Sequence, residues 1–473
     1  MCPFRRIAEG PTFDASTGLR PLFQAFVSKL AFLCCTTPGP PTISACAVLQ
    51  LPDRVQYVFG FNQRNESQLL EIQIGIARIL RLFTPSSGQR TRTDDQIRSE
   101  ALRASLELSE LRVRSYLKAL GDHLRDCLSA CRREATHNIN HSAVCDLIIS
   151  LSQLFRSDVF VDIRARLARE EDLMSTRHWS DFVHVAGRLQ SYKRAVDLIL
   201  LVTKTWPRLF SDFQVCMIPS SSGTPGILQG NPLTAHQVTR KMSSEPAFLD
   251  LYEDQIQHLS VHDLDGEIAR LWYTKPEPIV HAEVLVHDWL ENSEGGIRPE
   301  RFFNRWKFIG TSKPPCKLCS YFFDEYPTDV QVRSSHQNVY FPWRMPDIYE
   351  DQGDAARITR MRVIDRMKLR INADIARIMS EKLSDGRPHD SSAYTTLQPH
   401  GMTGTHTSPF PVEGTALLLD SLSIPDPQEH EDTGKGATET DQKFDESDGE
   451  ILLFQGRSAA QKDPHKKTNE KAD

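Results

Sequence analysis

The pattern of apolar and polar residues first predicts one helix followed by two strands. Residues 19–34 are apolar over most of a helical circumference, and a proline-rich run follows them, so a buried helix is expected to end there. Residues 42–51 and 54–62 are short apolar runs of strand length. The Pro-Asp pair at 52–53 joins them as a tight turn, which predicts a hairpin.

The apolar period then becomes helical and remains so from residue 67 to about residue 207. The segment 182–202, FVHVAGRLQSYKRAVDLILLV, is its most continuous part. Residues 218–232 are rich in Ser, Gly and Pro and predict a surface loop, after which another helix is expected to run to about Tyr273. The middle of the chain is therefore predicted to be a large helical block.

Mixed α/β character returns from residue 281. The predicted order is helix, strand, helix and strand, with the helices beginning at His281 and Cys316 and the strands at 306–311 and 329–334. One long helical pattern then covers 355–383. The remaining residues are polar and poor in aromatics, which predicts a disordered tail.

Composition places the chain in a broad class without naming a function. With 473 residues, 39% hydrophobic and 25% charged, it has the size of about two or three domains and the composition of a soluble globular protein. The net charge of -6 provides no overall basic field for nucleic acid or anionic membranes. Any such partner must be bound locally.

The N-terminal region predicts neither secretion nor a membrane span. Ten cysteines are too dilute for a disulfide scaffold, and the first residues lack the apolar stretch of a secretory signal. The most apolar early stretch, 22–51, is interrupted by Lys29 and three prolines, so it cannot cross a bilayer. We expect an intracellular protein with reduced thiols and no membrane partner; cytoplasm and nucleus are not distinguished.

Two short motifs carry candidate chemistry. The first is His281-Ala282-Glu283, and the second is Pro315-Cys316-Lys317-Leu318-Cys319. Thiols three residues apart at a helix start point to the same side, and the helix N-terminus favours the thiolate that binds metal. Pro315 suits a helix start because its missing N–H is not needed there.

Together the motifs predict catalytic zinc. One imidazole from His281 and two thiolates from Cys316 and Cys319 are three ligands, which leaves the fourth tetrahedral position open for water. Zinc then activates water near neutral pH, and Glu283 is placed to move protons as the catalytic acid and base. Either motif alone is weak, but the H-x-E and P-C-x-x-C combination is the signature of zinc-dependent nucleobase deaminases.

On these motifs the sequence resembles the zinc-dependent cytidine deaminase-like superfamily, and the layout is most similar to a fungal branch, the OTT-type nucleic acid/nucleotide deaminase-like family. The resemblance covers His281 to Met345. It implies an α/β fold with a cytidine deaminase-like α/β/α core, a Zn²⁺ cofactor, and hydrolytic deamination of a cytosine- or adenine-type base. It also implies that Asn62, at the end of the hairpin, and backbone groups of Ala282 and Pro315 contact the substrate.

The resemblance also suggests how the chain is divided. The opening helix and hairpin, 18–65, match the first elements of the deaminase core, and 276–383 supply the remainder with both motifs. Residues 66–275 would then be a helical insertion, since lengthening a loop costs little closure entropy. Residues 384–473 form the predicted disordered tail.

Several alternatives stay open at this stage. His336 or His287 would close the metal site as a fourth ligand, in which case the chain is a non-catalytic interaction protein with structural zinc. His336 and Tyr340 lie where superfamily members shape the base pocket; Tyr340, like Trp343, either stacks on a base or packs under a loop. Arg344 is a candidate for a substrate phosphate.

The substrate class is only partly bounded. A nucleobase-containing molecule is expected, with free nucleoside, nucleotide and single-stranded nucleic acid all open, because pocket shape decides among them. Oligomeric state is open as well.

Overall fold

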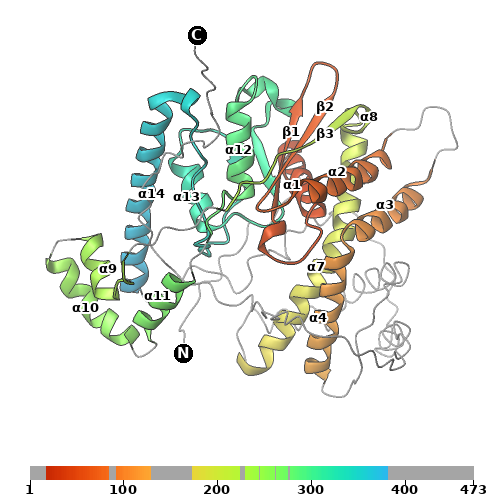
Figure 1. Cartoon of the computed structure of the whole chain (residues 1–473). Coiled ribbons are helices and arrows are strands. Elements are labelled where there is room, and N and C mark those ends of the chain that lie inside the picture. The colour runs from red at the N-terminus through yellow and green to blue at the C-terminus, as the bar shows by residue number, and fades with distance from the viewer. Residues whose placement is uncertain are drawn as a thin grey trace, which may run out of the picture.

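A five-stranded sheet with helices on both faces forms the centre of the molecule (Figure 1). The computed structural model describes residues 18–84, 92–128, 173–223, 230–243, 246–260, 263–274 and 277–381. Over these residues the chain has the mixed α/β fold that was predicted. The predicted disordered tail, 384–473, lies outside the described residues.

The predicted hairpin supplies two of the three inner strands of the sheet. Strands β1 (Ser44–Gln50) and β2 (Val55–Phe61) pair antiparallel, from Ser44↔Phe61 to Gln50↔Val55. The other edge of β1 pairs antiparallel with β4 (Phe308–Thr311), where Ala45 is opposite Thr311. The early hairpin and the segment after the H-x-E motif therefore belong to one sheet.

Two outer strands complete the order β3-β2-β1-β4-β5. Strand β3 (Phe213–Met217) is parallel to β2, and β5 (Gln331–Val332) is parallel to β4. Strand β3 was not predicted; it lies between the helical block predicted to end at about residue 207 and the loop predicted from residue 218. Its five residues, FQVCM, are too short for their alternation to stand out against the helical pattern before them.

Alternate residues of β1 face two different cores, as the period of a strand requires. Cys46 and Val48 lie in the core that contains helix α1 (Leu19–Leu33). Ala45, Ala47 and Leu49 lie in the core that contains helix α12 (Ala282–Asn292). The sheet thus separates an α1 face from an α12 face.

Glycines allow both helices to lie close to the sheet. A Cβ atom on Gly310 of β4 would lie 2.5 Å from the backbone nitrogen of Ser28 in α1. A Cβ atom on Gly60 of β2 would lie 2.8 Å from Cγ2 of Val286 in α12. Each glycine therefore permits a helix–strand contact that a larger residue would disturb.

The predicted helical block covers the α1 face. It contains α2 (Glu66–Arg81), α3 (Asp94–Leu108), α4 (Glu110–Leu128), α7 (Leu173–Thr205) and α8 (Arg208–Ser211). Apolar residues of α2, α3, α4 and α7 join those of α1 in one buried cluster.

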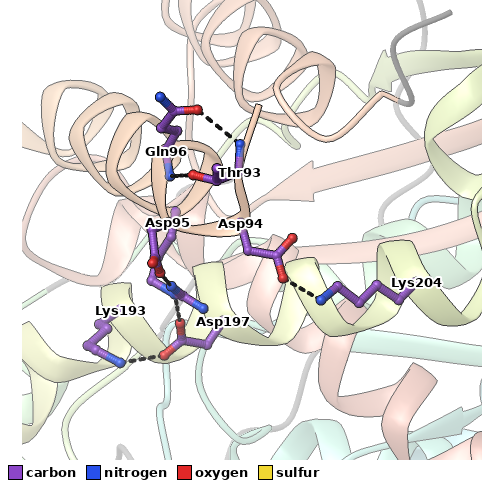
Figure 2. A network of polar contacts seen from close by, with 8 residues as sticks. Thr93, Asp94, Asp95, Gln96, Lys193, Asp197 and Lys204 are labelled. Atoms are coloured by element: carbon purple, nitrogen blue, oxygen red, sulfur yellow. Dashed lines mark hydrogen bonds and ion pairs between the residues drawn. The ribbon is translucent and has the colours of Figure 1, made fainter. Parts of the chain in front are cut away.

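Ion pairs connect α3 to α7 (Figure 2). Arg98 donates to Asp197 at 2.8 Å, Lys193 contacts the same carboxylate at 2.6 Å, and Lys204 pairs with Asp94. Thr93 caps α3 by accepting a hydrogen bond from the amide of Gln96. The outer side of α7 therefore has its lysines matched to carboxylates.

One helix was predicted after the loop, whose described parts are 218–223 and 230–234. Three described helices follow it instead. They are α9 (Ala235–Met242), α10 (Pro246–Ser260) and α11 (Leu264–Tyr273). Asp263 starts α11 from the left-handed conformation, with φ 55°, and caps it by accepting a hydrogen bond from the Gly266 amide. The apolar periodicity of this segment predicted one continuous helix, because periodicity alone does not reveal where a local cap starts a new helix.

The last part of the chain follows the predicted order. After α12 come β4, α13 (Lys317–Glu325), β5 and the long helix α14 (Gly353–Glu381). Within the described residues, four short 3₁₀ helices lie between larger elements: η2 (Pro40–Thr42), η3 (Pro299–Arg301), η4 (Phe303–Arg305) and η5 (Glu350–Gln352).

In the parts of the chain that the structure describes, none of the helices is both long enough and apolar enough to traverse a bilayer. The division into a split core and an insertion at the boundaries given above stays a prediction.

Candidate active site

His281, Cys316 and Cys319 meet at the N-terminal ends of two helices. His281 directly precedes α12, Cys316 directly precedes α13, and Cys319 lies in the first turn of α13. Nδ1 of His281 is 3.6 Å from Sγ of Cys316 and 3.3 Å from Sγ of Cys319, and the two sulfur atoms are 3.5 Å apart. All three side chains are buried.

This triangle has the dimensions of a zinc site. In a tetrahedral site with Zn–S of about 2.3 Å and Zn–N of about 2.0–2.1 Å, ligand atoms are separated by about 3.5–3.8 Å. Imidazole with two thiolates is also a donor set that suits zinc. Among the described residues, His281, Cys316 and Cys319 are the only His, Cys, Asp or Glu group whose ligand atoms converge in this way. These residues can hold a metal ion.

Helix α13 prepares its thiols for metal binding. Sγ of Cys316 accepts a hydrogen bond from the Cys319 amide at 3.5 Å, as a helix-capping group does. Burial by itself raises the pKa of Cys316, but the hydrogen bond from Cys319 and the positive potential of His281 outweigh it and hold this pKa well below its ordinary value. Cys316 is therefore the thiol that ionises first.

Two residues beyond the motifs support the ligands. The imidazole of His281 hydrogen-bonds the backbone carbonyl of Pro342, and the indole Nε1 of Trp343 donates to Sγ of Cys319 at 3.2 Å. Such outer contacts orient metal ligands and tune their basicity. The motifs gave no sign of either contact, because both depend on how the loop after β5 passes over α13.

Glu283 lies beside the donor group without belonging to it. It is in the first turn of α12, is 3% exposed, and its carboxyl group hydrogen-bonds the thiol of Cys319. Burial raises the pKa of Glu283, and the positive potential of His281 opposes that shift. A buried carboxyl group beside a metal site is suited to accept and return a proton.

Residues 280–347 match a family model described as OTT_1508_deam-like deaminase. This segment is therefore similar to a cytidine deaminase-like family. No curated protein and no solved structure matches it. The matched residues contain His281, Glu283, Cys316 and Cys319, so the deaminase family and the donor group describe the same site.

Asn62 connects the hairpin to the deaminase motif. It is 2% exposed; Oδ1 accepts a hydrogen bond from the Ala282 amide at 2.9 Å, and Nδ2 donates to the Pro40 carbonyl at 3.1 Å. Asn62 therefore lies next to the H-x-E motif, although it comes 219 positions before His281 in the sequence. The Ala282 amide is thus hydrogen-bonded to Asn62, and the substrate contacts of Asn62 and of the Ala282 backbone stay predictions.

A backbone hydrogen bond joins His336 to Pro315 beside the donor group. The His336 amide donates to the Pro315 carbonyl at 3.2 Å, which leaves one lone pair on that oxygen. Nδ1 of His336 accepts from the Asn338 amide at 3.0 Å, and Tyr340 packs edge-on against the imidazole at 5.6 Å. The structure thus places His336 and Tyr340 in one loop, and their contact with a substrate stays a prediction.

Arg344 contacts a carboxylate and a backbone carbonyl. Its guanidinium forms a two-point ion pair with Asp347, at 2.7 and 3.0 Å, and donates to the Ser222 carbonyl at 3.2 Å. The contact of Arg344 with a substrate phosphate stays a prediction. The motif could not show the ion pair, because Asp347 lies three residues beyond Arg344 in an irregular segment.

The proposed fourth ligands lie outside the metal group. Neither His287 nor His336 belongs to the converging set. His287 is buried among the rings of Phe322, Phe323 and Tyr326, and its Nε2 contacts Oγ1 of Thr328 at 2.9 Å. The described residues therefore provide three protein ligands rather than four.

An ion pair holds α14 against α13. Lys317, between the two cysteines, lies 2.6 Å from Asp374 of α14, and the Tyr321 hydroxyl donates to the same carboxylate. Lys317 is 5% exposed. Helix α14 therefore helps to position α13.

Proposed function

We propose that the chain is a zinc-dependent hydrolytic deaminase that acts on a cytosine- or adenine-type base in a nucleoside, nucleotide or nucleic acid. The observation that carries the proposal is the buried Glu283 carboxyl group beside a group of three protein metal ligands. Three ligands are the number found at catalytic zinc, whereas structural zinc has four. The deaminase family match supports the same assignment.

His281, Cys316 and Cys319 would hold the zinc ion. When bound, zinc supplies the Lewis acidity that makes water a nucleophile near neutral pH. Trp343 and the Pro342 carbonyl keep the thiolate and the imidazole in place.

Glu283 performs the proton transfers in this proposal. Its carboxylate oxygen takes a proton from the attacking water and delivers it to the ring nitrogen beside the reacting carbon. The carboxyl group then transfers the second proton of that water to the departing amino group. The ring carbon gains an oxygen, ammonia leaves, and the carboxylate is regenerated.

The experiment is metal analysis combined with an ammonia-release assay. Purified protein is analysed for zinc and incubated with cytosine and adenine nucleosides, nucleotides and single-stranded oligonucleotides. We expect one zinc per chain, and ammonia from at least one substrate class. Glu283→Gln should keep the zinc and lower the rate by about 10²–10⁴-fold, because proton transfer is lost.

Glu294→Gln is the matched control, because Glu294 is an exposed carboxylate just beyond the same helix. It should leave both zinc content and rate unchanged. Undiminished deamination in Glu283→Gln would exclude the mechanism. Bound zinc with no ammonia from any substrate would favour the non-catalytic interaction protein, and absence of zinc would remove the basis of both.

A further inference from the structure

A second buried polar cluster lies on the α1 face of the sheet, between α1, α4 and α7. It consists of Lys29 from α1, Arg112 from α4 and Arg188 from α7, which we call the cation cluster. Arg112 is 3% exposed and Arg188 is 6% exposed, whereas Lys29 is half-buried. Three side chains of one charge are therefore gathered in the interior.

Two aromatic rings join the three cations. The Phe32 ring lies 5.3 Å from Nζ of Lys29 and 5.1 Å from Cζ of Arg112. The Tyr116 ring lies 5.4 Å from Cζ of Arg112 and 5.7 Å from Cζ of Arg188. Contacts with aromatic faces stabilise cations, but they do not neutralise charge.

No carboxylate balances the cluster within the described residues. Arg112 donates to the Tyr116 hydroxyl at 2.7 Å and to the Cys35 carbonyl at 2.9 Å, which are neutral acceptors. Nε of Arg188 is buried without any hydrogen-bond partner there. The C-terminus of α1 contributes only about half a negative charge.

Further cations act on the same place. Burial, followed by the positive charges of Arg194, Arg333 and Arg188, lowers the pKa of Lys29 to about 7. The opposite side of α7 differs, because Lys193 and Lys204 are paired with Asp197 and Asp94 (Figure 2). Unbalanced charge is thus a local property of the cation cluster and not of α7 as a whole.

We infer that the cation cluster binds a small anion that carries several phosphate groups. Guanidinium groups match phosphate oxygens in two-point hydrogen bonds, and an oxygen at this position would satisfy the unpaired Nε of Arg188. A single phosphate carries about two negative charges at neutral pH, fewer than the three cations of the cluster. Nucleic acid and lipid headgroups are disfavoured, because a strand or bilayer cannot reach Arg112 and Arg188 in the interior.

The half-buried groups indicate the route of entry. Lys29 and Tyr116 are partly exposed, so the anion would enter past them and contact Arg112 and Arg188 at depth. Once bound, it would tie α4 and α7 to α1. The site stabilises the fold from the side opposite the metal group and does not depend on deaminase activity.

The test uses the full chain in phosphate-free buffer at constant ionic strength. Bound phosphorus is measured after acid denaturation of the purified protein, and Tm is followed during titration with inorganic phosphate, pyrophosphate and tripolyphosphate. We expect either co-purified phosphorus or a saturable rise in Tm of about 5 °C that strengthens with the number of phosphates. Neither phosphorus nor a rise, or an equal rise with potassium chloride, would overturn the inference.

Arg188→Met is the decisive variant. Removing a buried unpaired charge should leave Tm unchanged or higher without anion, and the apparent affinity for tripolyphosphate should fall at least tenfold. Lys29→Met, at the half-buried side, provides a second variant with the same expected loss if Arg188→Met does not fold. Lys204→Met on the same helix loses only its ion pair with Asp94 and should respond as wild type. Wild-type affinity in both cluster variants would also overturn the inference.

Discussion

Each face of the sheet carries a cluster of buried polar groups, and the two clusters require ligands of opposite charge. On the α12 face, His281, Cys316 and Cys319 form a donor group that is complete except for a cation. On the α1 face, Lys29, Arg112 and Arg188 form a group that lacks an anion among the described residues. Each cluster therefore requires a ligand whose charge is opposite to the charge that its own members leave unneutralised.

The largest expected effect is the loss of the α12-face group through Cys316→Ser. A serine hydroxyl is a poor replacement for a thiolate, so the zinc content should fall from one per chain to near zero and deamination should fall to background. Metal analysis and ammonia release measure this. The response to tripolyphosphate should persist, since it belongs to the other face.

Cys216→Ser is the control for that experiment. Cys216 is a half-buried thiol in β3 and is not part of the metal group. Full zinc content in Cys316→Ser, or loss of zinc in Cys216→Ser, would contradict the assignment of the ligands.

An intermediate effect is expected from Gly310→Ala. This variant tests whether a packing change on the α1 face leaves the metal group on the α12 face undisturbed. The new Cβ would meet backbone atoms of Val27 and Ser28, so α1 itself must shift. We expect a loss of about 1–3 kcal/mol in the free energy of unfolding, measured with urea, and a zinc affinity within twofold of wild type.

Gly60→Ala is the counterpart on the α12 face. The new Cβ atom would lie closest to Cγ2 of Val286, a side-chain atom that can move, and 3.3 Å from the Ala282 carbonyl. The loss in the free energy of unfolding should therefore be smaller than for Gly310→Ala. Because Ala282 adjoins His281, zinc affinity should fall more than in Gly310→Ala. Equal zinc affinities in the two variants would contradict the expectation that a change on the α1 face leaves the metal group on the α12 face undisturbed.

The smallest effect concerns pH and two neighbouring residues of α12. Burial, then the positive charge of Lys307, lowers the pKa of His287 to about 4. A lowered folded-state pKa gives stability that is present above pH 6.5 and is lost as pH falls through about 4. Burial, then Glu291 and Asp347, raises the pKa of Asp288 to about 6, so its contribution is present below pH 3.8 and is lost as pH rises through about 6.

The two contributions oppose each other between pH 4 and pH 6. Asp288→Asn removes one of them, so the variant should lose roughly 1–2 kcal/mol more stability than wild type as pH falls through this range. Urea unfolding at pH 4, 5, 6 and 7 measures it. Asp365→Asn, an exposed aspartate of α14, should follow the wild-type curve. Parallel curves for Asp288→Asn and wild type would exclude the compensation.

The metal group could be predicted because its information is local. Cys316 and Cys319 are fixed by one helical turn, and His281 and Glu283 lie at the start of another, so spacing alone indicated their chemistry. Asn62 required the resemblance to the deaminase superfamily, since only the folded sheet places it beside Ala282.

Other features depend on packing that no pattern records. Trp343 reaches Cys319 through an irregular loop, and the carboxylate of Asp347 occupies Arg344. β3 is recognisable only once β2 provides its partner. Arg112 and Arg188 are ordinary helix residues in sequence, and they become a cluster only when α4 and α7 pack against α1.

The pairing of β1 with β4 has a consequence for biosynthesis. Ala45 leaves the ribosome long before Thr311, its partner across the sheet. At about 5–20 residues per second, the 266 residues from Cys46 to Thr311 take roughly 13–53 s to translate. During that time one edge of the hairpin has no β4 to pair with, and an unpaired edge invites association with other chains. The nascent hairpin is therefore a natural client for chaperones until the strand between the two motifs has emerged.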